Sequence, residues 1–248
     1  MRTASIVSVI AATLCGLIAC LPADRLTRHG VPAGPIVCRG QFAFSPDDQH
    51  RSARWVLERL TPESLTGHAN RDGMRFVVDA DALPEVHATA SDYRASGFDQ
   101  GHLAPAANYT RTADMRATFN YGNCTPEVPE MNRGVMAKLE AHCRDIARTG
   151  DETWIVTAPV YTPPPGQRTL TITYVGANVV AVPPFVAKSL LVRRGTDYEC
   201  HSWIVPNVAG TQSLDSLRVT TDTVEFRCGL GLWGKLDKAT QDRIEAVR

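Results

Sequence analysis

Short apolar or alternating runs, separated by residues that favour turns, recur in both halves of the chain. Runs of this length predict β-strands, because alternate residues of a strand face the same side of a sheet. The predicted strands cover residues 41–44, 52–60, 74–79, 154–161, 170–175, 188–193 and 199–205. Residues 119–125 form a further β-compatible run that ends at Pro126.

One segment has helical rather than alternating spacing. From about Pro129 the apolar positions fall three or four residues apart, and Gly150 lies just past the last of them. These positions are Met131, Val135, Met136, Leu139, Cys143, Ile146 and Ala147. The spacing predicts one amphipathic helix that ends near Gly150.

Two shorter helices complete the expected elements. Residues 112–118 predict one or two helical turns, and Asp222 with Glu225 forms the capping-box pattern of a short helix ending near Gly229. Strands on both sides of one long helix favour an α+β fold, with a mostly antiparallel sheet core and flanking helices.

Composition narrows the classes of protein. The chain has 248 residues, of which 44% are hydrophobic, so it can bury one substantial core. Its 26 Lys and Arg residues balance 26 Asp and Glu residues. A binding site for a polyanion must therefore be a local arrangement of arginines rather than a basic protein surface.

The N-terminus is typical of a secretory signal. Residues 3–23 carry no charge and follow a single Arg2. Leu17-Ile-Ala-Cys20 is similar to a bacterial lipobox, so Cys20 is a candidate for lipid attachment to a membrane; a plain cleaved signal and a retained membrane anchor are the alternatives. We divide the chain into a signal (1–23), a lead-in segment (24–40) and one folded domain (41–248).

Beyond the signal, the cysteines are scattered: Cys38, Cys124, Cys143, Cys200 and Cys228. Without CxxC pairs they do not predict a zinc site. Disulfides between Cys200 and Cys228 and between Cys124 and Cys143 are candidates in an oxidising compartment, with buried free thiols as the alternative.

The candidate chemistry lies in the middle of the chain. His102 directly follows Gly101, where we expect a sharp turn from which the imidazole projects freely as a base. Asn132, Glu140 and Arg144 are spaced by multiples of four, so a helix places them within an arc of about a third of its circumference. Each of these residues has a structural alternative. His102 would then be a loop histidine hydrogen-bonded to the backbone, and Asn132 a helix cap. Glu140 and Arg144 would be a solvated i,i+4 ion pair.

Three ordered motifs carry a resemblance: Asp99-Gln-Gly-His102, Asn123-Cys-Thr-Pro-Glu127, and Asn132 to Glu140 followed by Arg144. In order and spacing they resemble the endonuclease G-like, DNA/RNA non-specific endonucleases of the ββα-metal (His-Me finger) superfamily. Lys188 and Val205-Pro-Asn207 are further landmarks, and the likeness extends from about residue 41 to the C-terminus. It implies that the α+β fold contains a ββα-metal active-site motif.

The resemblance also implies roles for individual residues. His102 would be the general base and Asn132 the direct ligand of one Mg²⁺, for which Mn²⁺ could substitute. Glu140 would orient water bound to the metal, and Arg144 would contact phosphate or the developing charge. Asp99 is expected to shape the turn before His102.

Further arginines are candidates for contacts with the nucleic-acid backbone. Arg75, Arg94 and Arg133 are assigned to substrate binding, and Arg71 is an alternative to Arg75 for one arginine of the family. Asn123 is placed beside the substrate, where its main expected role is to hold the backbone. Contacts confined to phosphates would give little sequence preference.

The resemblance implies an exported, Mg²⁺-dependent nuclease that cuts DNA and RNA to leave 5′-phosphates. Homodimers, common in the family, are a further expectation. Two positions depart from the family pattern: Gln100 stands where Arg is usual, and Glu127 where Gln is usual. The alternatives are a catalytically silent envelope-binding protein and a phosphodiesterase of small substrates, which the neutral overall charge would suit.

Overall fold

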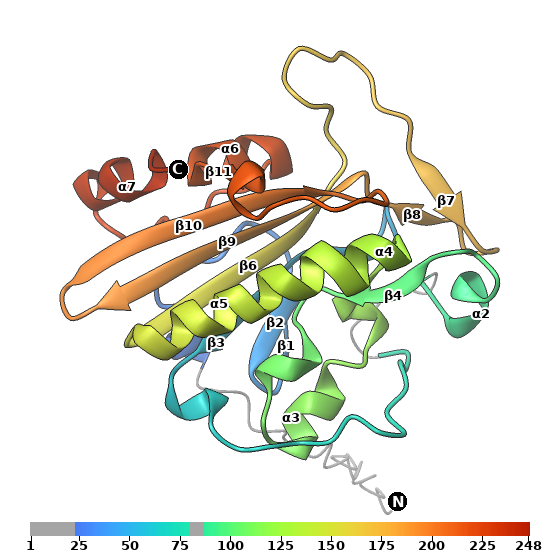
Figure 1. Ribbon diagram of the computed structural model, residues 1–248, viewed down its shortest axis with the longest axis horizontal. Helices are drawn as coiled ribbons and strands as arrows, with labels where there is room; N and C mark the ends of the chain where they lie inside the picture. Colours follow the sequence, from blue (N-terminus) through green and yellow to red (C-terminus); the bar gives the residue numbers. More distant parts are fainter. Residues whose placement is uncertain (1–22, 80–86) are drawn as a thin grey trace, which may run out of the picture.

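A seven-stranded antiparallel sheet is the centre of the computed structural model, which describes residues 23–79 and 87–248. Its strand order is β1-β2-β3-β6-β9-β10-β11 (Figure 1). The strands are β1 (Val37–Arg39), β2 (Phe42–Asp47), β3 (Ser52–Leu60), β6 (Glu152–Val160), β9 (Phe185–Arg194), β10 (Asp197–Pro206) and β11 (Arg218–Val219).

Both faces of this sheet are covered, so the central strands are buried over almost their whole length. In β6 every residue is buried, and neighbouring residues face opposite sides. Ile155 packs with Leu139 of helix α5 (Ala137–Thr149), whereas Trp154 packs in a second core with Val224 and Ile244. These last two residues belong to α6 (Thr221–Cys228) and α7 (Lys238–Glu245), which lie on the other side of the sheet from α5 (Figure 1).

The chain between β3 and β6 forms a separate layer beside α5. Its two strands, β4 (Asp99–His102) and β5 (Cys124–Glu127), pair antiparallel and lead into α5. The remaining elements of this layer are short: η1 (Glu63–Leu65), α2 (Ala90–Tyr93), η2 (Ala106–Asn108), α3 (Thr112–Ala117), η3 (Tyr121–Asn123), α4 (Pro129–Met131) and η4 (Asn132–Met136). Strand, strand and helix in this order give the expected ββα arrangement.

Three short elements lie elsewhere: α1 (Ala23–Leu26), the hairpin of β7 (Thr173–Val175) and β8 (Val180–Val182), and η5 (Asp215–Leu217). Leu26 is buried in the core beneath α6 and α7, and β1 pairs with β2. The packed fold therefore includes part of the segment that we assigned as a lead-in.

Most of the predicted strands are confirmed. The structure contains β2, β6, β9 and β10 with slightly different ends, and β3 covers the predicted residues 52–60. Residues 74–79 were predicted wrongly, because they form only an isolated bridge from Val77 to Asn120. Of 170–175 only Thr173–Val175 is a strand, and Tyr121–Asn123 is a 3₁₀ turn that precedes β5.

The helical predictions hold with two corrections. The long helix starts at Pro129 and ends before Gly150, but residues Asn132–Met136 form a π turn rather than an α turn. The helix α6 is capped by Thr220, whose side chain accepts from the N–H of Thr223, and not by Asp222. Gly229 ends this helix at φ 62°, a conformation that glycine adopts readily.

Among the described residues, Cys124, Cys143, Cys200 and Cys228 are free thiols, so neither candidate disulfide is formed. Within the same residues, no helix is both long and apolar enough to cross a membrane. The predicted signal, including Cys20, lies almost wholly outside the described residues.

Candidate active site

His102 is the last residue of β4 and pairs with Cys124 of β5. The expected turn is therefore absent at this position, and Gly101 is needed for another reason. A Cβ at Gly101 would lie 2.2 Å from Cδ of Glu127, so only glycine lets the two strands approach this closely.

The imidazole of His102 is enclosed rather than freely projecting. Its ring centroid lies 4.6 Å from that of Phe76 and 4.8 Å from that of Phe119, and Nε2 has no hydrogen-bond partner among the described residues. Burial, together with the nearby positive charge of Arg71, lowers the pKa of His102 to about 3. The ring is thus neutral at pH 7, which is the form that can accept a proton.

Asn132 is held by the strand that carries His102. Its Nδ2 donates to Oδ2 of Asp99 over 2.9 Å, and Arg133 makes a bidentate pair with the same carboxylate at 2.8 and 2.5 Å. Asp99 therefore ties β4 to the start of the long helix instead of shaping a turn. With its amide N–H₂ bonded, Asn132 retains its carbonyl oxygen for other ligands.

The π turn at Asn132–Met136 changes the expected geometry of the helix face. A π turn contains more residues than an α turn, so it rotates Asn132 relative to Glu140 and Arg144. Such turns are frequent at functional sites. The single arc predicted from spacing by fours does not describe this face.

Several charged residues interact with the buried Lys188, among them Glu140. Burial raises the pKa of Glu140 to about 7, although Lys188 and Arg144 act in the opposite direction. The ammonium of Lys188 donates to Thr157 at 2.6 Å and to the carbonyl of Leu103 at 3.3 Å. It thereby links Glu140 electrostatically to the residue that follows His102.

Glu58 and Asn108 extend this group. Glu58 is fully buried and accepts from Nδ2 of Asn108 at 2.8 Å and from the hydroxyl of Tyr109 at 3.1 Å. Arg144 donates to Oδ1 of Asn108 at 3.1 Å. Arg144 is therefore bonded within the protein and does not line the groove described below.

Glu127, one of the two departures from the family pattern, is fully buried under Gly101. Neither of its carboxyl oxygens has a hydrogen-bond partner among the described residues. Burial raises its pKa well above the ordinary value, and the neighbouring Glu140 raises it further. Burial thus favours the protonated form of Glu127, which is close in shape to glutamine and carries no negative charge.

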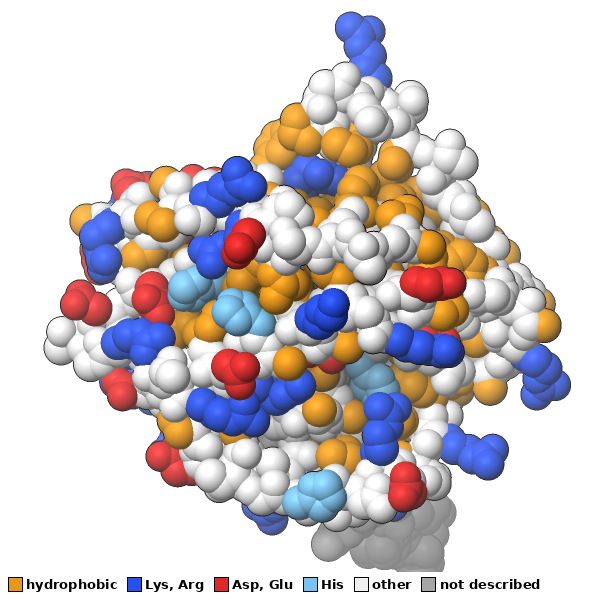
Figure 2. Space-filling view, viewed as in Figure 1, with side chains coloured by type: hydrophobic (Ala, Val, Ile, Leu, Met, Phe, Trp, Pro, Cys, Tyr) orange, Lys and Arg blue, Asp and Glu red, His pale blue; other side chains and the backbone are white. Residues whose placement is uncertain are grey.

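A groove of about 670 Å³ is lined in part by Phe76 and Phe119, whose rings contact His102; His102 itself is not among its lining residues. The residues that line it include Arg71, Arg75, Phe119, Gln100, Asn132 and Arg133. All three arginines are exposed, and Figure 2 shows basic side chains spread over this face around α4 and α5. Gln100, the second departure, donates to the hydroxyl of Tyr121 at 3.0 Å.

The structure separates the candidate substrate residues. Arg75 and Arg133 line the groove together with the alternative candidate Arg71, whereas Arg94 lies outside its lining. Asn123 is fully buried: Oδ1 accepts from the N–H of Ala104, and Nδ2 donates to the carbonyls of Ala104 and Thr118. It therefore holds the backbone after His102 and does not face a substrate.

Sequence reasoning gave no role to Glu58, Asn108 and Lys188. Glu58 and Lys188 are buried in β3 and β9, strands in which most residues are buried. A charged residue in such a strand is a usable signal, because an unpaired buried charge is costly. Their partners come from distant segments and cannot be read from local spacing.

Comparisons with known proteins agree with this arrangement. The model of the family described as DNA/RNA non-specific endonuclease matches residues 23–239. Mitochondrial endonuclease G of Bos taurus is 33% identical over 214 residues, which are 83% of this chain and 72% of that protein. Nuclease C1 of Cunninghamella echinulata var. echinulata is 36% identical over 211 residues, or 82% and 84% of the two chains.

A solved structure has the same fold. In the complex of EndoG with EndoGI, the matching chain superposes with a TM-score of 0.83 at 27% identity. The match covers 88% of this chain and 94% of the other. The mostly antiparallel sheet with flanking helices is therefore shared over almost the whole described structure.

Proposed function

Because this chain belongs to the DNA/RNA non-specific endonuclease family, we propose that it hydrolyses phosphodiester bonds of both DNA and RNA in a Mg²⁺-dependent reaction that leaves 5′-phosphates. The observation that carries this proposal is the link through Asp99. It fixes the amide of Asn132 beside the strand that presents the neutral His102. Asn132 thus lines the groove together with Phe76 and Phe119, the two rings that contact His102.

The donor set fits a magnesium ion. Mg²⁺ prefers oxygen ligands and keeps several waters, so few protein atoms are needed. Asn132 would hold the ion through its carbonyl oxygen, since Asp99 occupies its amide N–H₂. When bound, the ion would neutralise charge on the reacting phosphate and on the leaving oxygen.

The protein's own groups account for the proton transfer. The imidazole of His102 would accept a proton from the attacking water, and the rings of Phe76 and Phe119 hold the imidazole in place. A bound phosphate would offset the positive charge of Arg71, which lowers the pKa of His102 in the free protein. Substrate binding therefore makes His102 a stronger base.

Substrate recognition is assigned to phosphate contacts. Arg71, Arg75 and Arg133 line the groove and offer planar donors that suit phosphate oxygens. DNA and RNA share this backbone, so such contacts carry little sequence information. Gln100 removes one charge that the family usually supplies, which favours weaker binding without loss of the base or the metal ligand.

The proposal is tested by incubating purified protein with supercoiled plasmid and with RNA, in Mg²⁺ or in EDTA. We expect cleavage of both, lost in EDTA and in His102→Ala. No cleavage by the unmutated protein with any of several divalent metals would contradict it and favour the silent binding protein. Cleavage of a small phosphodiester alone would favour the second alternative.

We also propose that the protein is exported. The support is the uncharged run of residues 3–23, with Cys20 in a sequence similar to a lipobox. Lipid attachment would leave Cys20 as the modified first residue of the mature chain. The mass of the mature N-terminal peptide distinguishes this from simple cleavage and from a retained segment.

A further inference from the structure

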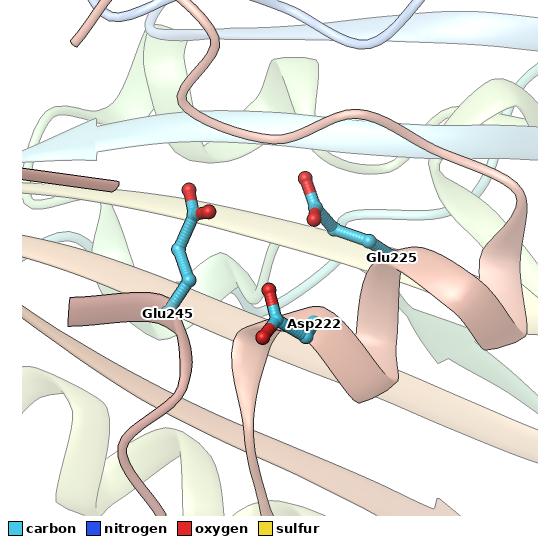
Figure 3. Close-up of side chains that lie close together, drawn as sticks. All are labelled: Asp222, Glu225 and Glu245. Carbon is cyan, nitrogen blue, oxygen red and sulfur yellow. The ribbon is translucent and has the colours of Figure 1, made fainter. Parts of the chain in front are cut away.

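Three carboxyl groups meet between the two C-terminal helices, on the side of the sheet opposite to α5. Asp222 and Glu225 lie one turn apart on α6, and Glu245 is the last residue of α7. One oxygen from each lies within 4.8 Å of the other two. Figure 3 shows the three side chains converging on a common space. None of them lines the nuclease groove.

Glu245 indicates that this space holds a ligand. The residue is only 5% exposed, and its Oε1 is buried without a hydrogen-bond partner among the described residues. A buried acceptor that makes no hydrogen bond is costly, which leaves this carboxyl in need of a donor or a cation.

The nearby protein groups do not supply that partner. Glu225 accepts from the N–H of Leu232, which satisfies one of its own oxygens. The charge of Lys238 acts on both Glu225 and Glu245, but its ammonium donates to Asp242 at 2.5 Å. Burial and the two acidic neighbours raise the pKa of Glu245 to about 7. None of these groups bonds to Oε1 of Glu245, so a bound cation is a suitable partner for that oxygen.

We propose that Asp222, Glu225 and Glu245 bind one divalent cation of the size of Ca²⁺, which joins α7 to α6. Ca²⁺ binds oxygens at about 2.4 Å, so ligands on opposite sides of it are up to about 4.8 Å apart. The three oxygens lie within this limit of one another, so they can bind Ca²⁺ without rearrangement. Asp222 is exposed, which gives the ion a path from solvent and room for waters.

The competing occupant is a proton shared among the carboxyls. This alternative predicts that Ca²⁺ neither binds nor stabilises the protein at pH 8. A cation site predicts binding that depends on all three carboxylates. The shared proton and the bound cation can be distinguished with Glu245→Gln. The glutamine resembles the protonated acid but cannot replace a charged ligand.

The test uses the full chain with Asn132→Ala, which removes the proposed nuclease metal ligand. Calorimetric titration with CaCl₂ at pH 8 should show one bound Ca²⁺ per chain, with a rise in Tm. Adding Glu245→Gln should weaken binding by at least tenfold and abolish the rise in Tm. Asp48→Asn, which neutralises an exposed carboxylate outside the cluster, is the matched control and should leave binding unchanged.

Absence of Ca²⁺ binding in the Asn132→Ala protein would overturn the proposal, as would unchanged binding after Glu245→Gln. Folding is checked separately by placing Glu245→Gln in the otherwise unmutated protein. Plasmid cleavage should then remain at its original rate, because the cluster is remote from the groove. The binding result does not depend on whether the proposed nuclease activity is observed.

Discussion

Asn132 donates a 2.9 Å hydrogen bond to Asp99, three residues before the histidine that we assign as the base. This bond joins the second half of the ββα arrangement to the first. It also fixes which atom of the Asn132 amide remains available for a metal. The Asp99 carboxylate therefore positions the start of the long helix relative to β4, although Asp99 and Asn132 are 33 residues apart in the sequence.

Asp99→Ala should reduce cleavage by about 10–100-fold, the usual effect of losing a group that orients a metal ligand. The Mg²⁺ concentration needed for half-maximal activity should rise, because the Asn132 amide is then free to rotate. Plasmid cleavage over a range of Mg²⁺ concentrations measures both effects. Asp99→Asn retains one acceptor oxygen and should lose less; equal activity of Asp99→Ala and the unmutated protein would exclude the positioning role.

The cleavage rate should depend on pH through Glu140 rather than His102. His102 has a pKa of about 3 and stays neutral over the working range, whereas Glu140 has a pKa of about 7. Since the ionised carboxylate is the form that can orient water beside a cation, kcat/KM should increase as pH rises through 7. Glu140→Gln should be slow and should lack this rise. A rise that persists in Glu140→Gln would assign it to another group.

The elements of the fold were predictable where local pattern and tertiary environment agree. The strand at residues 52–60 has an alternating sequence and does lie between two cores. The enclosure of His102 was not predictable, because Phe76 and Phe119 reach it from separate segments. Spacing by fours identified the correct helix but could not reveal the π turn at Asn132, which leaves the apolar pattern almost unchanged.

Glu127→Gln should make stability less dependent on pH. Its pKa is higher in the folded than in the unfolded protein, so the folded state binds more protons and stability falls as pH rises above about 4.5. The limiting slope for one such group is about 1.4 kcal/mol per pH unit. Urea unfolding at pH 5 and pH 8 should therefore show that Glu127→Gln gains stability over the unmutated protein mainly at pH 8.

Glu130→Gln, an exposed change on α4, is the control for Glu127→Gln. It should leave the difference between pH 5 and pH 8 as in the unmutated protein. If Glu127→Gln were equally stabilising or destabilising at both pH values, then Glu127 would not be an acid that stays protonated in the folded protein and ionises on unfolding.

Lys188→Met should destabilise the protein by about 3–5 kcal/mol, the usual cost of removing one partner from buried charges. Lys188 is 2% exposed and its charge acts on Glu58 and Glu140. Adding Glu58→Gln should recover part of the loss, since it removes one carboxyl that loses its counter-charge. Urea unfolding of both variants measures this, and the absence of any recovery would argue that Lys188 acts through packing alone.

Groove arginines should control substrate affinity and its salt dependence. Arg71→Ala removes a cation from the groove. The negative slope of log binding constant against log salt concentration should therefore become shallower by about 0.9 for duplex DNA. Arg94→Ala is the matched control, because Arg94 is exposed but outside the groove lining, and its slope should be unchanged.

Gln100→Arg should act in the opposite direction and steepen the slope by a similar amount. This gain is expected even though the variant loses the hydrogen bond from Gln100 to Tyr121, which contributes only about 0.5–1.5 kcal/mol. Equal slopes for Arg71→Ala and Arg94→Ala would show that the polyanion does not follow the groove.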